Sequence, residues 1–251
     1  MSKYFSRLIF LFLPIMAICQ NEPIDLQPKD TVKYTDKYGI RVGVDISKLV
    51  LTFVDEDYTG LELVGDYRLT NKMYLAAEIG NETKAQRENL NNTLLYDFET
   101  TGSYIKAGVD LNTYQNWFGM NNLITIGGRY AVSSFNHTLN DYSIFDSNRL
   151  YSDDFLPGAQ PGQKFEGLNA SWLEFVLGVK AELFANIFVG MSARLGFLVT
   201  NKEDDRFKNL WIPGFNKVTD GSNFGVSYNY SISYLIPLYK KSKKIEPEKQ
   251  E

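Results

Sequence analysis

The sequence is short of cysteine, histidine and recognisable catalytic motifs, and each shortage excludes a class of site. Cys19 is the only cysteine and His137 the only histidine. If Cys19 leaves with a leader peptide, the mature chain has neither a disulfide nor a thiol site. The sequence also contains no phosphate-binding loop, paired metal-ligand motif or nucleophile elbow. We therefore expect no cofactor and no metal.

Long apolar segments are also lacking. The longest such run is Leu8–Ile18, which is too short to span a bilayer and contains Pro14. No other stretch is apolar enough to form a transmembrane helix. Because only helices and closed barrels satisfy their backbone groups in lipid, a chain of this kind would have to cross a membrane as a barrel.

The first residues predict a signal peptide over residues 1–19. Lys3 and Arg7 precede the apolar run, and Ala17-Ile18-Cys19 forms a small-x-small cleavage site before Gln20. The alternative is a lipoprotein anchored through Cys19, although the preceding Ile18 is bulkier than such a site prefers. Cleavage after Cys19 is the interpretation that we favour.

The charge balance disfavours a nucleic-acid partner. The formal net charge is -4, and removal of Lys3 and Arg7 with the signal peptide would take it to -6. An acidic secreted chain lacks the basic surface that nucleic-acid binding requires.

What the sequence does contain is strict alternation, clearest in residues 169–200. Two strands are predicted there, joined by a tight turn at Ala185-Asn186. Alternate positions are apolar, at Leu173, Phe175, Leu177, Val179, Ala181 and Leu183, and then at Val189, Met191, Ala193, Leu195, Phe197 and Val199. A period of two places these residues on one face of each strand. The other face carries glycine and full charges of both signs.

The same alternation predicts eight strands, at about 38–47, 58–69, 72–80, 100–111, 123–134, 169–184, 187–200 and 223–238. The longest connections, 81–99, 135–168 and 201–221, follow the third, fifth and seventh strands. Tight turns at Thr70-Asn71 and Ala185-Asn186 follow the second and sixth. In an antiparallel barrel, the long loops then gather at one end, as in outer-membrane barrels. A flexible leader (20–37) and a charged tail (240–251) flank the predicted barrel (38–239).

The charged row decides which face is inside. Its members are Arg41, Asp45, Glu62, Asp66, Arg68, Glu78, Lys106, Asp110, Arg129, Glu174, Lys180, Glu182 and Arg194. These charges nearly balance, so they can pair in a shared lumen, whereas unpaired buried charges would be too costly. We therefore predict an all-β fold, an eight-stranded antiparallel up-and-down transmembrane β-barrel with a lumen charge network. The alternative is a soluble periplasmic ligand-binding barrel that turns this row to water.

The chain resembles the small eight-stranded outer-membrane barrels of the OmpA/OmpX-like class. More narrowly, it is similar to a family of outer-membrane barrels of Bacteroidota that is classified as a domain of unknown function. The residues that carry the likeness are Ala17-Ile18-Cys19-Gln20, Tyr38–Asp45 (YGIRVGVD) and Gly65–Arg68 (GDYR). The resemblance implies a fold and a location, and it carries over no catalytic residue.

Two stretches could carry chemistry. His137 follows Ser133 and Ser134 at the end of the fifth strand, which leaves a rim lipid-modifying enzyme as an alternative. The longest loop holds a candidate surface set: Asp141, Tyr142, Phe145, Tyr151, Asp153, Asp154 and Phe155. Its aspartates lack the spacing of a calcium loop.

The function that we expect is non-enzymatic, a structural or surface-interaction role through long extracellular loops. Eight strands leave room for side chains in the lumen but hardly for a pore. The expected partners are outer-membrane lipids, the outer-membrane assembly machinery and an unidentified extracellular ligand. Both termini are expected in the periplasm.

Overall fold

The computed structural model describes residues 35–90, 93–114, 121–142, 162–204, 206–219 and 221–242. The predicted signal peptide, the leader up to residue 34 and the tail beyond residue 242 lie outside these ranges. Within them, no helix is long and apolar enough to cross a membrane.

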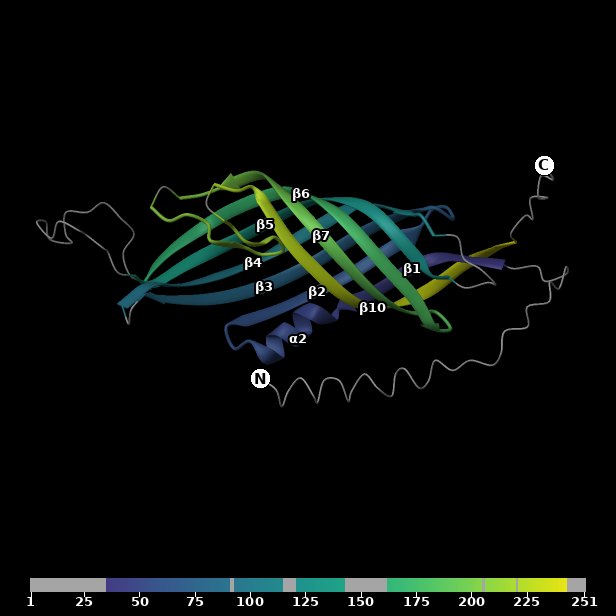
Figure 1. Ribbon diagram of the computed structural model, residues 1–251, viewed down its shortest axis with the longest axis horizontal. Helices are drawn as coiled ribbons and strands as arrows, with labels where there is room; N and C mark the ends of the chain where they lie inside the picture. The colour runs from purple at the N-terminus through teal and green to yellow at the C-terminus, as the bar shows by residue number, and fades with distance from the viewer. Residues whose placement is uncertain are drawn as a thin grey trace, which may run out of the picture. The chain divides into compact units, whose positions relative to one another are not determined.

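Eight long strands form one closed antiparallel barrel (Figure 1). They are β1 (Thr35–Asp45), β2 (Tyr58–Arg68), β3 (Met73–Leu90), β4 (Thr93–Asn112), β5 (Leu123–Tyr142), β6 (Gln163–Phe184), β7 (Ile187–Lys202) and β10 (Phe224–Ser242). The order around the ring is β1-β10-β7-β6-β5-β4-β3-β2. Chain neighbours therefore pair throughout, and β1 closes on β10. The predicted eight-stranded antiparallel up-and-down barrel is confirmed.

The barrel has two different ends. At the terminal end, β1 begins, β10 finishes, and tight turns join β2 to β3 and β6 to β7. At the loop end lie the connections of β3 to β4, β5 to β6 and β7 to β10. The last of these contains a short hairpin, β8 (Trp211–Ile212) and β9 (Asn216–Lys217). Asn186 adopts a φ of 72°, as the predicted tight turn after β6 requires.

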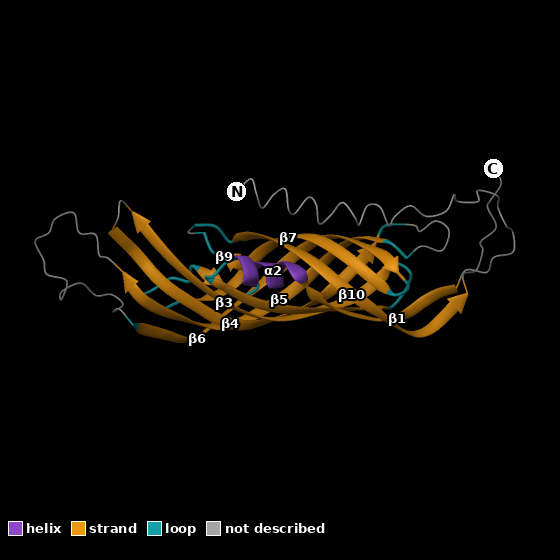
Figure 2. Ribbon diagram, turned by 90° about the horizontal axis from the view of Figure 1, so that it is seen from below, coloured by secondary structure: helices purple, strands orange, loops and turns teal. Residues whose placement is uncertain are grey.

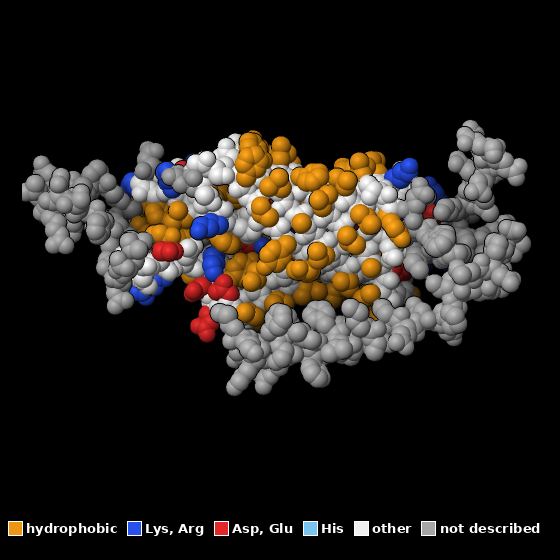
Figure 3. All heavy atoms as spheres, in the orientation of Figure 1, with side chains coloured by type: hydrophobic (Ala, Val, Ile, Leu, Met, Phe, Trp, Pro, Cys, Tyr) orange, Lys and Arg blue, Asp and Glu red, His pale blue; other side chains and the backbone are white. Residues whose placement is uncertain are grey.

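The outer surface is apolar around the middle of the barrel and charged near its ends (Figure 3). Leu177 and Val179 on β6, and Met191 on β7, are about half exposed. Their inward neighbours include Val176 and Arg194, which are buried. The alternation read from the sequence therefore places the apolar row outside and the charged row inside. We call the outer apolar surface the apolar belt.

Several strands are longer than the sequence predicted. The segment 81–99, predicted to be a long loop, instead continues β3 and β4, which pair as far as Leu90 and Thr93. Likewise, β5 continues to Tyr142, and β6 already begins at Gln163. Apolar alternation stops where these strands leave the apolar belt, because polar residues then suit both faces. The pattern therefore marked the end of the belt and not the end of the strand.

The structure also contains a helix that the sequence did not predict, α2 (Ile46–Val54). It begins where β1 ends, and Asp45 Oδ1 accepts a hydrogen bond from Ser47 N (2.7 Å) as its N-cap. Nine residues show too few turns for a helical period to stand out. Figure 2 shows α2 lying along the side of the barrel beside β10.

Candidate functional site

The centre of the lumen is an ion-pair network. Arg194 donates to both oxygens of Glu78, at 2.5 and 3.1 Å. Arg129 holds both oxygens of Asp110, each at 2.8 Å. Bidentate guanidinium–carboxylate pairs are short, directional and strong, so they fix the side chains that fill the lumen. All four residues are buried.

Further pairs extend this network along the barrel. Lys106 Nζ lies 2.9 Å from Glu174 Oε1, which also accepts a hydrogen bond from Trp172 Nε1 (2.7 Å). Towards the terminal end, Asp66 is shared by Arg41 (2.7 Å) and Lys180 (2.6 Å). The lumen is therefore filled by charges that neutralise one another in successive layers.

Charges nearest the terminal end are held more loosely. Arg68 Nη2 lies 3.6 Å from Asp36, and Arg68 Nη1 donates to the backbone oxygen of Lys37 (2.9 Å). Asp36 was assigned to the leader, but it belongs to β1 and contributes to this mouth of the barrel.

Asp45 and Glu182 lie outside this network, although the sequence placed them in it. Neither Asp45 nor Glu182 forms an ion pair with any described residue. Asp45 instead accepts hydrogen bonds from Ser47 at the start of α2. Glu182 instead accepts hydrogen bonds from Asn121 Nδ2 (2.6 Å) and Asn186 N (2.9 Å). One residue therefore caps a helix and the other fixes a turn.

Towards the loop end, sequence reasoning missed a further pair, Lys48 with Glu82. Glu82 is fully buried and also accepts a hydrogen bond from Gly214 N (3.2 Å). Nearby, Glu62 accepts from Tyr104 Oη (2.6 Å) and Asn229 Nδ2 (3.0 Å). Lys48 and Glu82 were missed because both lie in segments predicted to be connections, where no inward face could be assigned.

On the loop-end side of the charges, the β8–β9 hairpin closes the lumen with apolar side chains. The Phe215 ring packs edge-on against Trp172, with ring centroids 5.6 Å apart. A side chain at Gly196 or Gly225 would come within 2.8 Å of the Phe215 ring, so the absence of side chains at these two positions leaves room for the ring. The surrounding buried cluster comprises Phe98, Tyr104, Ala131, Phe135, Leu139, Phe165, Leu168, Ala170, Trp172, Leu198, Ile212 and Phe215.

We call the β8–β9 hairpin and the buried cluster around it the plug. His137 lies within this plug and not at an open rim. Its Nδ1 lies 2.5 Å from Thr100 Oγ1, and its Nε2 lies 2.9 Å from Asn209 Oδ1. The rings of Phe98 and Phe135 contact it, and the imidazole is fully buried. A catalytic histidine of the triad type needs a serine and an acid on its two nitrogens, and here threonine and asparagine occupy those places.

His137 also gives the plug a pH dependence that can be measured. It lies beyond the apolar belt, and burial lowers its pKa from 6.5 to about 4. Between those values the unfolded chain binds a proton that the folded chain does not, so stability falls as the pH falls from about 6.5 to 4. We expect wild type to lose about 2–3 kcal/mol more than His137→Gln over this range.

The measurement is urea unfolding of both chains in lipid vesicles at pH 7 and pH 4.5. The glutamine variant serves as the control because other titrating groups act equally on both chains. Parallel losses of stability in the two chains would contradict the placement of a neutral, buried His137.

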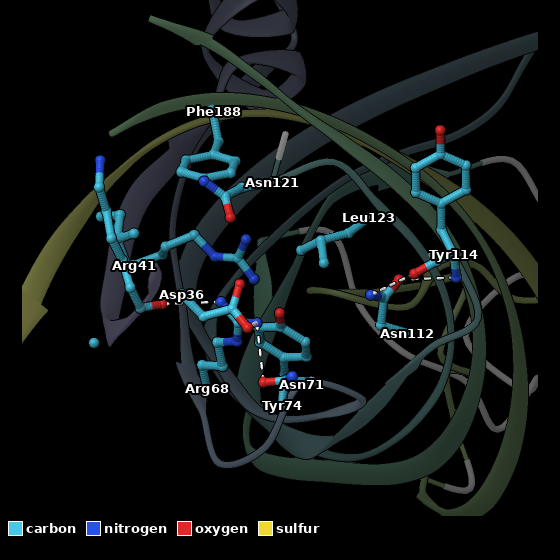
Figure 4. Close-up of a pocket in the computed structure, with 13 residues that line it drawn as sticks. Asp36, Arg41, Arg68, Asn71, Tyr74, Asn112, Tyr114, Asn121, Leu123 and Phe188 are labelled. Carbon is cyan, nitrogen blue, oxygen red and sulfur yellow. Dashed lines mark hydrogen bonds and ion pairs between the residues drawn. The ribbon is translucent and has the colours of Figure 1, made fainter. Parts of the chain in front are cut away.

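Two small cavities lie among the lumen charges, and a larger one of about 300 Å³ lies at the loop end beside Asn209, between β7 and the start of β10. One, of about 40 Å³, lies beside Glu78 and Arg129, and another, of about 90 Å³, opens at the terminal end. Figure 4 shows Arg41 and Arg68 from β1 and β2 projecting into the latter, beside Tyr74. The two lumen cavities hold a few water molecules and no larger solute.

The candidate surface loop lies mostly outside the described residues, including Phe145, Tyr151, Asp153, Asp154 and Phe155. Asp141 and Tyr142 form the last two residues of β5, and Asp141 is exposed. In the part of the chain that the structure describes, no group of His, Cys, Asp or Glu could hold a metal ion.

Comparison with solved structures finds similarity to bacterial proteins at low identity. Ail, the attachment invasion locus protein of Yersinia pestis, is 9% identical, with a TM-score of 0.37 over 81% of this chain and 99% of that one. CarO of Acinetobacter baumannii is 9% identical (TM-score 0.39, 80% and 98% covered). CarO2 of the same organism is 10% identical (TM-score 0.39, 80% and 99% covered).

Comparison with curated proteins finds no match. A family model described as "Domain of unknown function (DUF6048)" matches residues 1–241, which is nearly the whole chain. The protein therefore belongs to the DUF6048 family.

Proposed function

We propose that this protein is an integral outer-membrane barrel with a side-chain-filled lumen, acting in a non-enzymatic structural or surface-interaction role through its loop end. The observation that carries the proposal is the reversed polarity of the wall. Every barrel strand presents apolar residues outward, while buried ion pairs occupy the inside. Such a wall suits lipid outside and a polar lumen inside.

The same observation disfavours a soluble periplasmic barrel. Soluble proteins rarely expose a contiguous apolar patch larger than a few hundred Å², whereas here the apolar belt covers the middle of the molecule (Figure 3). In lipid this surface needs no other partner. The bilayer itself is therefore the first partner that we propose, and the outer-membrane assembly machinery is the second.

The filled lumen supports a role at the surface over transport. Ion pairs and the β8–β9 plug occupy the barrel, and the two cavities among the lumen charges hold only about 40 and 90 Å³. The burial of His137 between Thr100 and Asn209 likewise supports a non-enzymatic role over lipid modification. An extracellular ligand would then bind at the loop end. The resemblance to barrels of Bacteroidota suggests the outer membrane of such a bacterium.

The proposed orientation places the loop end outside the cell and both termini in the periplasm. Asn89, near the tip of the β3–β4 hairpin, and Lys72, in the β2–β3 turn, are both exposed and lie at opposite ends. With Cys19 replaced by serine, we expect a membrane-impermeant maleimide to label Asn89→Cys on intact cells. Lys72→Cys should react only after the outer membrane is permeabilised.

The two cysteines control for each other, since both become labelled once the cells are opened. The reverse pattern would show an inverted barrel and remove the surface role. Labelling of both positions in an osmotic-shock fraction, with none on cells, would instead support a soluble periplasmic protein.

A further inference from the structure

The barrel wall is incomplete along one side. β1 pairs with β2 only between Ile40 and Val44, and with β10 only as far as Ser231. Beyond this point β10 continues from Tyr230 to Phe224 paired with β7 alone, and β2 continues towards Tyr58 paired with β3 alone. Two strand edges therefore face a gap in the wall, and α2 fills it.

A gap at this place matters because it lies within the apolar belt. Leu61 on β2 and Val226 on β10 flank it, and both side chains point outward. Inside a bilayer, unpaired backbone groups of a strand edge cost several kcal/mol each. Whatever fills the gap must therefore satisfy or shield them.

On the β2 side, α2 satisfies the edge in detail. Thr52 Oγ1 accepts a hydrogen bond from Gly60 N (2.9 Å), and its single hydrogen faces Lys48 O (2.9 Å) and Gly60 O (3.2 Å). The hydroxyl therefore satisfies the Gly60 N–H that a neighbouring strand would otherwise bind. The chain after the helix adds Tyr58 N to Asp55 O (3.1 Å). Together these bonds tie the helix to β2.

Two ion pairs strengthen the same side. Lys48 reaches from α2 into the lumen to Glu82 on β3. Lys84 Nζ lies 2.8 Å from Asp55 Oδ2, at the end of the helix. The helix is therefore anchored to β2 and β3 along its whole length.

The β10 side is held much more loosely. Its one hydrogen bond runs from Tyr230 N to Asp45 Oδ1 (3.4 Å), at the base of the helix. Because strand residues alternate in the direction of their backbone groups, Val226 and Tyr228 present theirs to the same side as Tyr230. These groups form no hydrogen bond with α2 or any other described residue on that side.

Polar groups lie directly behind the loosely held seam. The face of α2 that looks inward carries Lys48, whereas Phe53 points outward and is 87% exposed. Behind Lys48 are Glu62, which accepts a hydrogen bond from Asn229 Nδ2, and the buried hydroxyl of Tyr58, which lies beside Lys48 and Glu82. A side movement of α2 would connect these polar groups with the lipid phase.

We propose that α2 is a hinged lateral door, anchored to β2 and β3 and opening along β10, which admits a membrane-dissolved amphiphile to the polar groups behind Lys48. The chain of the amphiphile would stay among Phe53 and the outward residues of β10, and its polar head would meet Lys48 and Tyr58. This inference rests on the proposed membrane insertion, and it adds a route through the wall where the lumen itself is filled.

The test uses the full chain with Cys19→Ser, folded into phosphatidylcholine vesicles that contain a maleimide attached to an acyl chain. Asn229→Cys places a thiol behind the door. Ser133→Cys places a matched thiol on β5, the strand opposite β1 in the ring, and both native residues are buried. We expect Asn229→Cys to react with the reagent and Ser133→Cys to stay unreacted.

The attachment of α2 is tested by adding a substitution at Thr52 to each thiol, because a helix held less firmly to β2 moves away from the barrel more readily and the seam along β10 opens with it. Thr52→Val keeps the shape and removes the bonds to Gly60, so labelling at Asn229→Cys should rise roughly tenfold, the factor expected for one or two neutral hydrogen bonds. Thr52→Ser keeps the hydroxyl and should leave the rate unchanged. Lys84→Met removes the ion pair with Asp55 and should also raise the labelling rate at Asn229→Cys. It serves in place of Thr52→Val if that variant fails to fold.

Heat-modifiable migration on gels reports whether each variant is folded in the vesicles. Folded variants in which Asn229→Cys stays unreacted, or reacts no faster with Thr52→Val and Lys84→Met, would overturn the door and leave the membrane barrel standing. Equal labelling at Ser133→Cys would also overturn it, since that result means general opening. Failure of the parent chain to enter vesicles would overturn both proposals.

Discussion

Replacement of Arg194 by methionine is expected to lower the free energy of unfolding of the barrel in lipid by about 3–5 kcal/mol. Arg194 is buried and is bound in bidentate fashion by Glu78. Its Nη1 also lies 3.7 Å from Glu174. Methionine fills a similar volume without charge. The loss of unfolding free energy therefore measures the cost of leaving buried carboxylates without a neutralising cation. Urea-dependent unfolding in lipid vesicles measures it.

The matched control removes a lumen cation whose carboxylate partner remains paired with a second cation. Asp66 is held by both Lys180 and Arg41, and the Lys180 side chain is 23% exposed near the terminal end. Lys180→Met should therefore cost no more than about 1 kcal/mol, as for pairs that retain access to water. Equal, small losses for the two variants would show that the lumen charges are hydrated and not a buried network.

The second large effect is expected on the outer face. Leu177 points outward from β6, between Ile126 on β5 and Ala193 on β7, and is 47% exposed. If this surface meets the middle of a bilayer, Leu177→Arg should cost about 2–4 kcal/mol in vesicles. The same unfolding assay measures the loss.

A matched arginine outside the apolar belt separates the membrane from a general effect of charge. Thr101 points outward from β4 beside Thr83, beyond the belt. Thr101→Arg should therefore cost about 0–1 kcal/mol, the value for positions near the interface. If both arginines were tolerated equally, the outer face at Leu177 would be in water and the proposed insertion would be wrong.

The central part of the barrel could be predicted because period-two alternation survives wherever the outer and inner faces of the wall carry opposite residue types. Leu177 and Lys180 are three positions apart and therefore on opposite faces, as the structure shows. The turns at Thr70-Asn71 and Ala185-Asn186 could be predicted too, since each interrupts two well-defined rows. The charged row identified the lumen for the same reason.

What could not be predicted depends on partners far apart in the chain. Glu82 joins the lumen network through Lys48, yet the segments around both lack alternation. The burial of His137 is completed by Phe207 and Asn209, from the connection between β7 and β10. Similarly, α2 is a helix because its ends and Thr52 meet groups on β2 and β10. Such contacts have no local signature.

The most direct test of the membrane barrel is fractionation of the untagged protein from cells that express the full chain. We predict that it sediments with the outer membrane, resists extraction at alkaline pH, and migrates differently on gels before and after boiling. Recovery in the osmotic-shock fluid as a soluble protein, with no heat-dependent shift, would contradict the account.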